Sequence, residues 1–227
     1  MNQLRQVSDD LWTRDTLLSL SLGLRLPLRM TVFRLPSGKL VLHNPVAMDD
    51  TLAAELAALG AVSELAAPNL GHHLSVEPTL KRFPAAVVRG CPGLAAKKPQ
   101  VSFASELGDE APSAYEGVLE TAFLRGATRL NEVVFFHRSS RTLVVSDLVF
   151  NVVTPANAAT AFLLTLTGTR GRLAKSRLVS SMIRDRAAFS ASLERVLDWD
   201  FDRVLMAHGD PVHEGGHAAL ARVLGAV

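Results

Sequence analysis

The sequence predicts an α/β protein in which two groups of strands form mixed sheets that pack together, with helices on the outside. Short β-branched, apolar runs alternate with longer segments that have helical periodicity. The strand-like runs fall into two groups separated by helical segments. Two sheets that pack together, with the helices on their outer faces, accommodate this order of elements. At 227 residues, the chain fits one domain spanning residues 1–227 that can bury most of its apolar surface.

The first half of the chain carries the signals of a hairpin followed by alternating helices and strands. Apolar residues alternate with polar ones on one side of a Pro-Ser-Gly turn, which is typical of a hairpin. Asp49 or Asp50 provides an N-cap for the helix that follows, and Gly60 provides its C-terminal stop. The predicted elements are a hairpin over residues 26–43, a helix over 51–59, a strand over 62–67, a helix that ends near 81 and a strand over 84–89.

The second half predicts further strands and three helical segments. Pro155 suits the first position of a helix that Gly168 ends. Apolar residues at near-helical spacing, Leu178 among them, predict one further helical region with a stripe that faces the core. The predicted elements are strands over 117–124, 131–136, 142–150 and 201–207 and helices over 156–166, 175–197 and 216–224, whereas residues 90–112 are predicted as a loop.

Composition and charge argue against several classes of partner. The net charge is only +2, and the basic patches at residues 97–98 and 170–177 are modest, so we expect no nucleic-acid binding. No apolar run approaches the ~20 residues that span a membrane, so we expect neither a signal peptide nor a membrane partner. The single cysteine, Cys91, cannot form an internal disulfide, which implies a reducing compartment or indifference to redox. Together with the expected lack of a signal peptide, this predicts a cytoplasmic protein.

A carboxylate at the end of a buried strand is the clearest sign of a functional site. Residues 143–145 are apolar without alternation, which is typical of a strand covered on both faces. Asp147 follows directly, and a buried carboxylate is costly unless a partner compensates its charge. His72, His73 and His208 are the candidate partners, because each follows another strand-like run. These residues alone do not specify a reaction.

The same segments resemble the metallo-β-lactamase-fold superfamily. The run from Thr142 to Phe150 resembles the strand whose Asp bridges two metal ions in that superfamily. The run from Arg203 to Pro211 resembles its final strand, which a metal-binding His-Gly pair follows. The resemblance implies a four-layer αββα sandwich over nearly the whole chain, in a divergent branch.

The sequence departs from the superfamily's His-x-His-x-Asp-His motif. The four ligand positions of that motif fall on about Asn69, Gly71, His73 and Leu74, so three of them lack an imidazole. Ala127 stands where a middle Gly-His-Thr motif would provide another histidine. The usual site for two metal ions is therefore not expected.

The remaining residues predict a reduced metal site. Its predicted ligands are His72, His73, Asp147 and His208, with Asp147 also predicted as a catalytic residue. Such a set could hold one Zn²⁺, or an iron or manganese ion, with one position open for water. A chain without any metal is the alternative. His43 ends a strand at the same expected edge and is either a substitute ligand or a hydrogen-bonded structural residue.

Three functions fit these residues. The first is a metal-dependent hydrolase of a small-molecule ester, thioester or phosphoester. The second is a non-catalytic relative that binds a small molecule or a partner in the inherited cleft. The third is a metal-free hydrolase with a serine or Cys91 as nucleophile, which ranks last because no Gly-x-Ser-x-Gly motif is present. The oligomeric state is not predicted.

Overall fold

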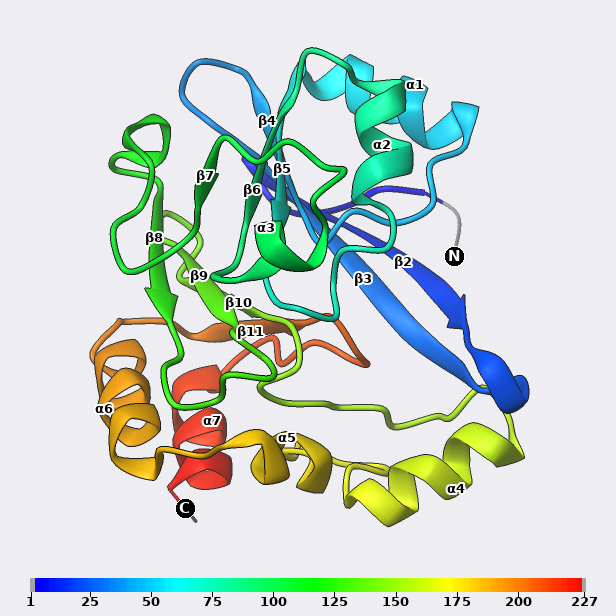
Figure 1. Ribbon diagram of the computed structural model, residues 1–227, viewed down its shortest axis with the longest axis vertical. Helices are drawn as coiled ribbons and strands as arrows, with labels where there is room; N and C mark the ends of the chain where they lie inside the picture. Colours follow the sequence, from blue (N-terminus) through cyan, green and yellow to red (C-terminus); the bar gives the residue numbers. More distant parts are fainter. Residues whose placement is uncertain (1–2, 226–227) are drawn as a thin grey trace.

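Two mixed sheets form the centre of the computed structural model, which describes residues 3–225 (Figure 1). In the seven-stranded sheet, the first four strands are antiparallel neighbours and the last four are parallel neighbours. Its strands, in spatial order, are β1 (Arg5–Ser8), β2 (Leu11–Ser19), β3 (Arg25–Arg34), β4 (Leu40–His43), β5 (Val62–Ala67), β6 (Val87–Gly90) and β7 (Ser105–Glu106). The hairpin predicted over residues 26–43 is therefore confirmed as β3 and β4.

The four-stranded sheet carries the segments that resemble the superfamily. Its central strand β10 pairs in parallel with β11 and antiparallel with β9. Its strands, in spatial order, are β11 (Arg203–Met206), β10 (Thr142–Val145), β9 (Val133–His137) and β8 (Leu119–Phe123). The two strands that precede Asp147 and His208 are thus direct neighbours that run in the same direction.

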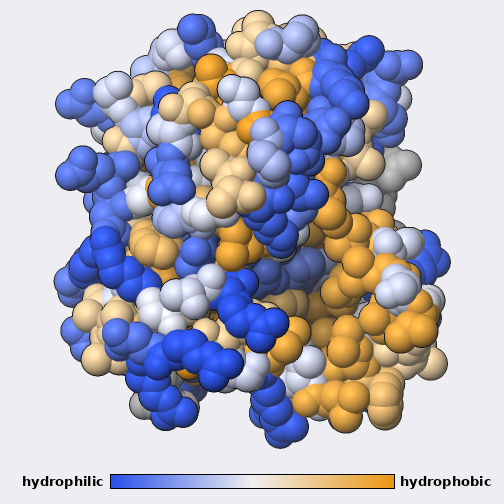
Figure 2. All heavy atoms as spheres, viewed as in Figure 1, coloured by the Kyte–Doolittle hydropathy of each residue, from blue (hydrophilic) through white to orange (hydrophobic). Residues whose placement is uncertain are grey.

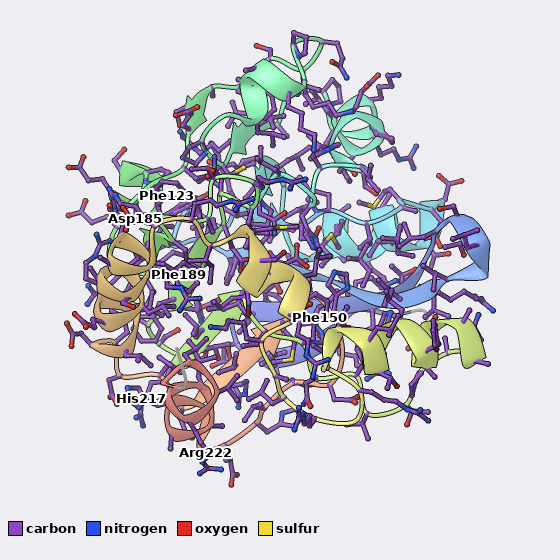
Figure 3. The ribbon with its side chains drawn as sticks, turned by 60° about the horizontal axis from the view of Figure 1, so that its bottom comes forward. Phe123, Phe150, Asp185, Phe189, His217 and Arg222 are labelled. Atoms are coloured by element: carbon purple, nitrogen blue, oxygen red, sulfur yellow. The ribbon has the colours of Figure 1, made fainter. Side chains whose placement is uncertain are left out.

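Helices cover the outer sides of both sheets (Figure 1). Near the seven-stranded sheet lie α1 (Asp50–Leu59), α2 (Val76–Arg82) and α3 (Leu94–Lys97). Across the bottom of Figure 1, and facing the viewer in Figure 3, run α4 (Ala158–Thr167), α5 (Arg177–Met182), α6 (Arg186–Leu197) and α7 (Gly216–Leu224). Within the described residues, no helix combines the length and the apolar character needed to cross a membrane. The layered α/β arrangement predicted from the sequence is confirmed.

The core between the sheets explains why β10 has no polar alternation. Val144 belongs to the cluster that joins both sheets, in which Phe33 of β3 stacks on Phe135 of β9 with ring centroids 6.1 Å apart. Leu143 and Val145 face the other way, into the cluster that packs against α6 and α7. Both faces of β10 are therefore buried, as the sequence predicts.

The helical region predicted over residues 175–197 is wrong in its continuity, because the structure has two helices there. The backbone amides of Arg184 and Asp185 both donate to the carbonyl of Gly126, which takes the chain out of the helix. The Asp185 side chain then caps α6 by accepting from the amide of Ala188. Leu178, expected in the core stripe, is 56% exposed on α5.

Other boundaries also differ from the prediction. The strands predicted over 84–89 and 142–150 are the shorter β6 (Val87–Gly90) and β10 (Thr142–Val145). The helix expected to begin at Pro155 begins at Ala158, because Asn157 is its N-cap and accepts from the amide of Thr160. The segment predicted as a loop, residues 90–112, contains α3 and the short edge strand β7. By contrast, Asp49 caps α1 as expected, accepting from the amide of Leu52.

Gly209 joins the loop after β11 to the loop after β10. It forms an isolated parallel bridge with Asn151, and its φ of +109° lies in the region that favours glycine. A Cβ at this position would meet the carbonyl oxygen of Asn151 at 2.2 Å. Glycine here keeps His208 beside the chain that follows Asp147.

We expect Gly209→Ala to lower the free energy of unfolding by more than about 1 kcal/mol, because it adds both a strained φ and a backbone clash. Urea unfolding monitored by circular dichroism measures this change. Gly171→Ala is the matched control, since Gly171 also has a positive φ (+71°) but no atom within 4 Å of its Cβ position. Equal losses in the two variants would show that the close approach to Asn151 contributes nothing.

Candidate metal centre

Three side chains from both sheets meet at one point of the structure. His72 lies in the loop after β5, Asp147 follows β10, and His208 follows β11. The Nε2 atom of His72 lies 3.2 Å from Oδ2 of Asp147, and Nε2 of His208 lies 3.3 Å from Oδ1. One ligand atom from each residue falls within 4.8 Å of the other two. The carboxyl ends of three strands therefore form a single cluster.

The outer nitrogen of each imidazole has a fixed partner. Nδ1 of His208 lies 2.7 Å from the carbonyl oxygen of Pro27, which can only accept, so Nδ1 carries a proton. Nδ1 of His72 lies 2.8 Å from Oδ1 of Asn44. The Asn44 amide is oriented because its Nδ2 donates to the carbonyl oxygen of Arg29 at 2.7 Å. With Nδ1 protonated, each ring in its neutral form directs an unprotonated Nε2 at Asp147.

An unprotonated Nε2 and a carboxylate oxygen are both hydrogen-bond acceptors, so they repel each other unless a proton or a metal cation lies between them. Either each Nε2 is protonated, or a cation is bound by both imidazoles and the carboxylate. For ligand distances of about 2.0–2.1 Å, neighbouring ligands of a tetrahedral ion are separated by about 3.3 Å. The separations of 3.2 Å from His72 and 3.3 Å from His208 are of this size, but they end on two different oxygens of Asp147. The donor types, two imidazoles and one carboxylate with one atom of each within 4.8 Å of the other two, fit one first-row divalent ion with a fourth position open.

Polar groups around Asp147 hold it in place. Asn69 donates its amide Nδ2–H to Oδ2 of Asp147 at 2.8 Å, and its Oδ1 accepts from the backbone amides of Gly71 and His72. Asn69 thus orients both the carboxylate and the loop that carries one imidazole. On the other side, Glu132 is fully buried and accepts from the backbone amide of Asp147 at 2.8 Å.

The charges in this cluster are unequal. Burial raises the pKa of Asp147, but attraction to His72 and the hydrogen bonds with both histidines outweigh burial and hold it well below its usual range. Burial lowers the pKa of His208, yet Asp147 raises it overall. Burial, followed by repulsion from Asp147, raises the pKa of Glu132 to about 7. Asp147 is therefore the anion of the cluster.

A pocket of about 240 Å³ opens onto this cluster. His72, Asp147 and His208 line its polar part. The opposite wall is apolar and comes from the β2–β3 hairpin and its tip, through Leu18, Leu20, Leu26 and Leu28. The ring of His208 also stacks on Phe150, with centroids 5.0 Å apart and an interplanar angle of 10°. The pocket thus joins a charged end to an apolar wall.

Comparison with known proteins places the chain in a family. Residues 8–167 match the family described as Domain of unknown function (DUF4336). The chain belongs to the DUF4336 family. A search of curated proteins found no match to the sequence.

Solved structures show the fold of this DUF4336 chain. A metallo-β-lactamase from Pontibacter korlensis is 13% identical, with a TM-score of 0.66 over 99% of this chain and 98% of that one. A metallo-β-lactamase from Erythrobacter litoralis is 11% identical, with a TM-score of 0.68 over 99% and 96% of the two chains. A metal-soaked flavodiiron core from Synechocystis is 13% identical, with a TM-score of 0.65 over 97% of this chain and 59% of that one. The chain has the metallo-β-lactamase fold, as its sequence resemblance predicts.

The structure does not bring His73 into the cluster. His73 is partly exposed and is not among the described residues whose ligand atoms meet at Asp147. Burial, followed by the charges of Lys98 and Lys97, lowers its pKa. The loop turns His72 inward instead, so one of the two adjacent histidines joins the site and its neighbour lies at the pocket wall.

Two further sequence expectations concern buried residues. His43 was expected as a substitute ligand or a hydrogen-bonded residue, but neither of its ring nitrogens has a hydrogen-bond partner among the described residues. Its ring packs edge-on against Phe135, with centroids 4.8 Å apart. Cys91 is fully buried, and burial, followed by the charge of Glu106, raises the pKa of its thiol to about 12. Such a thiol is a poor nucleophile at neutral pH.

Sequence reasoning missed the supporting roles of Asn44, Asn69 and Glu132. Glu132 carried a signal, because it is the one charged residue at the start of the apolar run 133–136. Asn44 has a φ of +54°, which asparagine tolerates better than most residues. Its hydrogen bond to His72 spans 28 residues of sequence and leaves no local pattern.

We expect His43 to make the fold sensitive to acid. Burial, followed by the charge of His72, lowers the pKa of His43 to about 3, below its usual value of 6.5. As the pH falls below 6.5, the unfolded chain binds a proton at His43 before the folded chain does. The free energy of unfolding is therefore unaffected by this group above about pH 6.5 and falls by about 1.4 kcal/mol per pH unit between about pH 6.5 and pH 3. His43→Leu removes this contribution.

Urea unfolding of the wild type and His43→Leu at pH 7, 6 and 5 tests this expectation, because the stability difference between them should shift in favour of the variant as the pH falls. The exposed His213→Leu is the control. A difference that is constant across these pH values would contradict the role assigned to His43.

Proposed function

We propose that this chain is a metal-dependent hydrolase that uses one first-row divalent ion, of which zinc, iron and manganese are the candidates. Its ligands are His72, Asp147 and His208. One observation carries the proposal: both histidines have their Nδ1 protons committed to oxygen acceptors, so that both Nε2 lone pairs face one ionised carboxylate. The metal-soaked flavodiiron core and the metallo-β-lactamases that share the fold support the binding of a metal by a protein of this fold.

The chemistry of the proposed site follows from its donors. When bound, a divalent ion with an open position activates water at neutral pH and polarises a carbonyl or phosphoryl oxygen. Asp147 and the two Nε2 atoms hold the ion, while Pro27 and Asn44 keep both rings in the binding tautomer. The leucine wall of the pocket binds the apolar part of a substrate and excludes water from that side.

The substrate proposed is a small ester, thioester or phosphoester. A pocket of about 240 Å³ limits the part of the substrate that enters, and its leucine wall favours an apolar substituent next to the scissile bond. Glu132 and Asn69 contact Asp147 but do not themselves line the pocket, so we assign them to positioning the carboxylate.

Metal content tests whether the chain binds a divalent ion through His72, Asp147 and His208. We expect the purified, tag-free chain to hold one divalent ion per molecule, and Asp147→Ala and His208→Ala to lose it, because each removes one of three ligands. Inductively coupled plasma mass spectrometry measures the bound metal. His73→Ala is the matched control for His72→Ala, since the two residues are adjacent and only one faces Asp147. Equal loss in both would contradict the ligand set.

Residues that orient the proposed ligands are expected to affect the affinity for the metal ion. Asn44→Gly keeps the positive φ but removes the acceptor for Nδ1 of His72, so we expect metal affinity to fall by about 10- to 100-fold. Competition with a fluorescent chelator measures it. Asn131→Gly is the matched control, because Asn131 also has a positive φ (+50°) and one hydrogen bond, to the carbonyl of Pro92. Unchanged affinity in Asn44→Gly would overturn the tautomer argument.

Activity distinguishes hydrolysis from binding alone. We expect the metal-loaded chain to hydrolyse chromogenic esters, thioesters or phosphodiesters with an apolar substituent, and Asp147→Asn to be inactive on the same panel. If the loaded chain turns over none of them but is stabilised by non-reacting analogues, the alternative of a non-catalytic binding protein replaces the hydrolase.

A further inference from the structure

The tip of the β2–β3 hairpin and helix α4 are fastened together at the surface. Thr160 of α4 accepts from the backbone amide of Arg25 at 2.9 Å and donates to its carbonyl at 3.1 Å. Asn157 donates to the carbonyl of Gly23, in the short 3-10 turn Ser21–Gly23 at the hairpin tip. Beneath them, a small cluster of buried residues contains Leu26, Val152 and Leu164. The two elements therefore present one supported surface.

This surface exposes large apolar side chains. The most exposed is Leu22 at the hairpin tip, at 91%, and Phe162 on α4 is 66% exposed. We call the exposed set the apolar platform; it consists of Leu20, Leu22, Phe162 and Leu166. Figure 2 shows apolar side chains gathered at the lower right, in the region of the hairpin tip and α4 in Figure 1. Soluble proteins seldom expose such groups together without a partner.

All charged residues in the segment that contains α4 are basic. Residues 148–184 contain no aspartate or glutamate, although the whole chain has 22 of them. The basic residues of this segment are Arg170, Arg172, Lys175, Arg177 and Arg184. A segment with this bias produces a positive field beside the exposed apolar side chains.

Three of these arginines gather at the C-terminal end of α4. Nη1 of Arg177 donates to the carbonyl of Leu166 at 3.3 Å, and Nη2 of Arg172 donates to that of Gly168 at 3.3 Å. Nη1 of Arg170 reaches Oγ1 of Thr165 at 3.5 Å. All three remain exposed, and Leu166, a member of the platform, lies among them. Cationic groups thus adjoin the apolar platform at this end of α4.

Charge decides which occupant suits this surface. A second copy of the chain would bring two positive surfaces together, and repulsion would oppose that contact. An anionic lipid surface complements both features, because apolar side chains enter the boundary between headgroups and acyl chains while arginines bind the phosphates. Protruding leucine and phenylalanine residues flanked by arginines are typical of proteins that lie on a membrane without crossing it.

We propose that the apolar platform docks the chain on an anionic lipid surface. The proposal goes beyond the hydrolase function and does not depend on it. Leu20 belongs both to the platform and to the wall of the metal-site pocket, so the mouth of the pocket would lie next to the lipid. Docking of this kind requires no apolar run long enough to span a membrane.

Vesicle sedimentation of the full chain tests the proposal. We expect binding to vesicles of phosphatidylcholine mixed with phosphatidylglycerol, and little binding to phosphatidylcholine alone. Added salt should weaken the binding, because it screens the arginines. Equal binding to both vesicle types without a salt effect, or no binding to either, would overturn the proposal.

Two sets of variants locate the docking surface. We expect the double variant Leu22→Ser, Phe162→Ser and the triple variant Arg170→Gln, Arg172→Gln, Arg177→Gln each to weaken vesicle binding on the order of tenfold or more. Val87→Ser is the control for the first, because Val87 is 41% exposed on β6. Arg222→Gln is the control for the second, because exposed Arg222 lies on α7, away from α4 (Figure 3).

Further controls separate a loss of vesicle binding from a loss of folding. Leu22→Ser alone changes only the hairpin tip, so it keeps the test valid if the arginine variant unfolds the end of α4. Thermal melting by circular dichroism confirms that each variant is folded. If analytical ultracentrifugation instead shows a dimer that Leu22→Ser disrupts, and no vesicles are bound, a second copy covers the platform and the lipid proposal is wrong.

Discussion

The compensation of one buried carboxylate is the constraint on which the rest of the site depends. Asp147 follows a strand that is covered on both faces, and its own side chain is only 17% exposed at the pocket, so water hydrates its charge only in part. Two imidazoles and the Asn69 amide surround it. Removing any one of these groups would leave a buried charge incompletely paired, which is far more costly than losing an exposed ion pair.

This constraint connects the two sheets. His208 and Asp147 follow parallel neighbours of the four-stranded sheet, whereas His72 follows β5 of the seven-stranded sheet. The outer nitrogens of the imidazoles extend the connection to Pro27 on β3 and to Asn44 just after β4. The hairpin that supports the site also provides the leucine wall of its pocket, so the position of the proposed metal ligands and the shape of the pocket are set together.

The fold is shared with metallo-β-lactamases, but the donor set differs from the superfamily motif that the sequence resembles. Asn69 stands at about the first ligand position of that motif and donates a hydrogen bond to Asp147. The amide N–H of Asn69 therefore satisfies one acceptor site of the Asp147 carboxylate, in place of a histidine that would bind a metal. Among the described residues, three bring ligand atoms together, and catalytic zinc sites in proteins typically have three protein ligands and one open position.

The sequence by itself determined the elements whose signals are local. The hairpin turn, the Asp49 cap of α1 and the closing helix α7 each depend on a few adjacent residues, and Asp147 and His208 follow apolar runs that are visible without a structure. Only the tertiary structure decided that His72 faces inward in place of His73, that Glu132 lies beneath Asp147, and that the carbonyl of Gly126 separates α5 from α6. These outcomes rest on hydrogen bonds between segments far apart in the chain, whose partners no local pattern reveals.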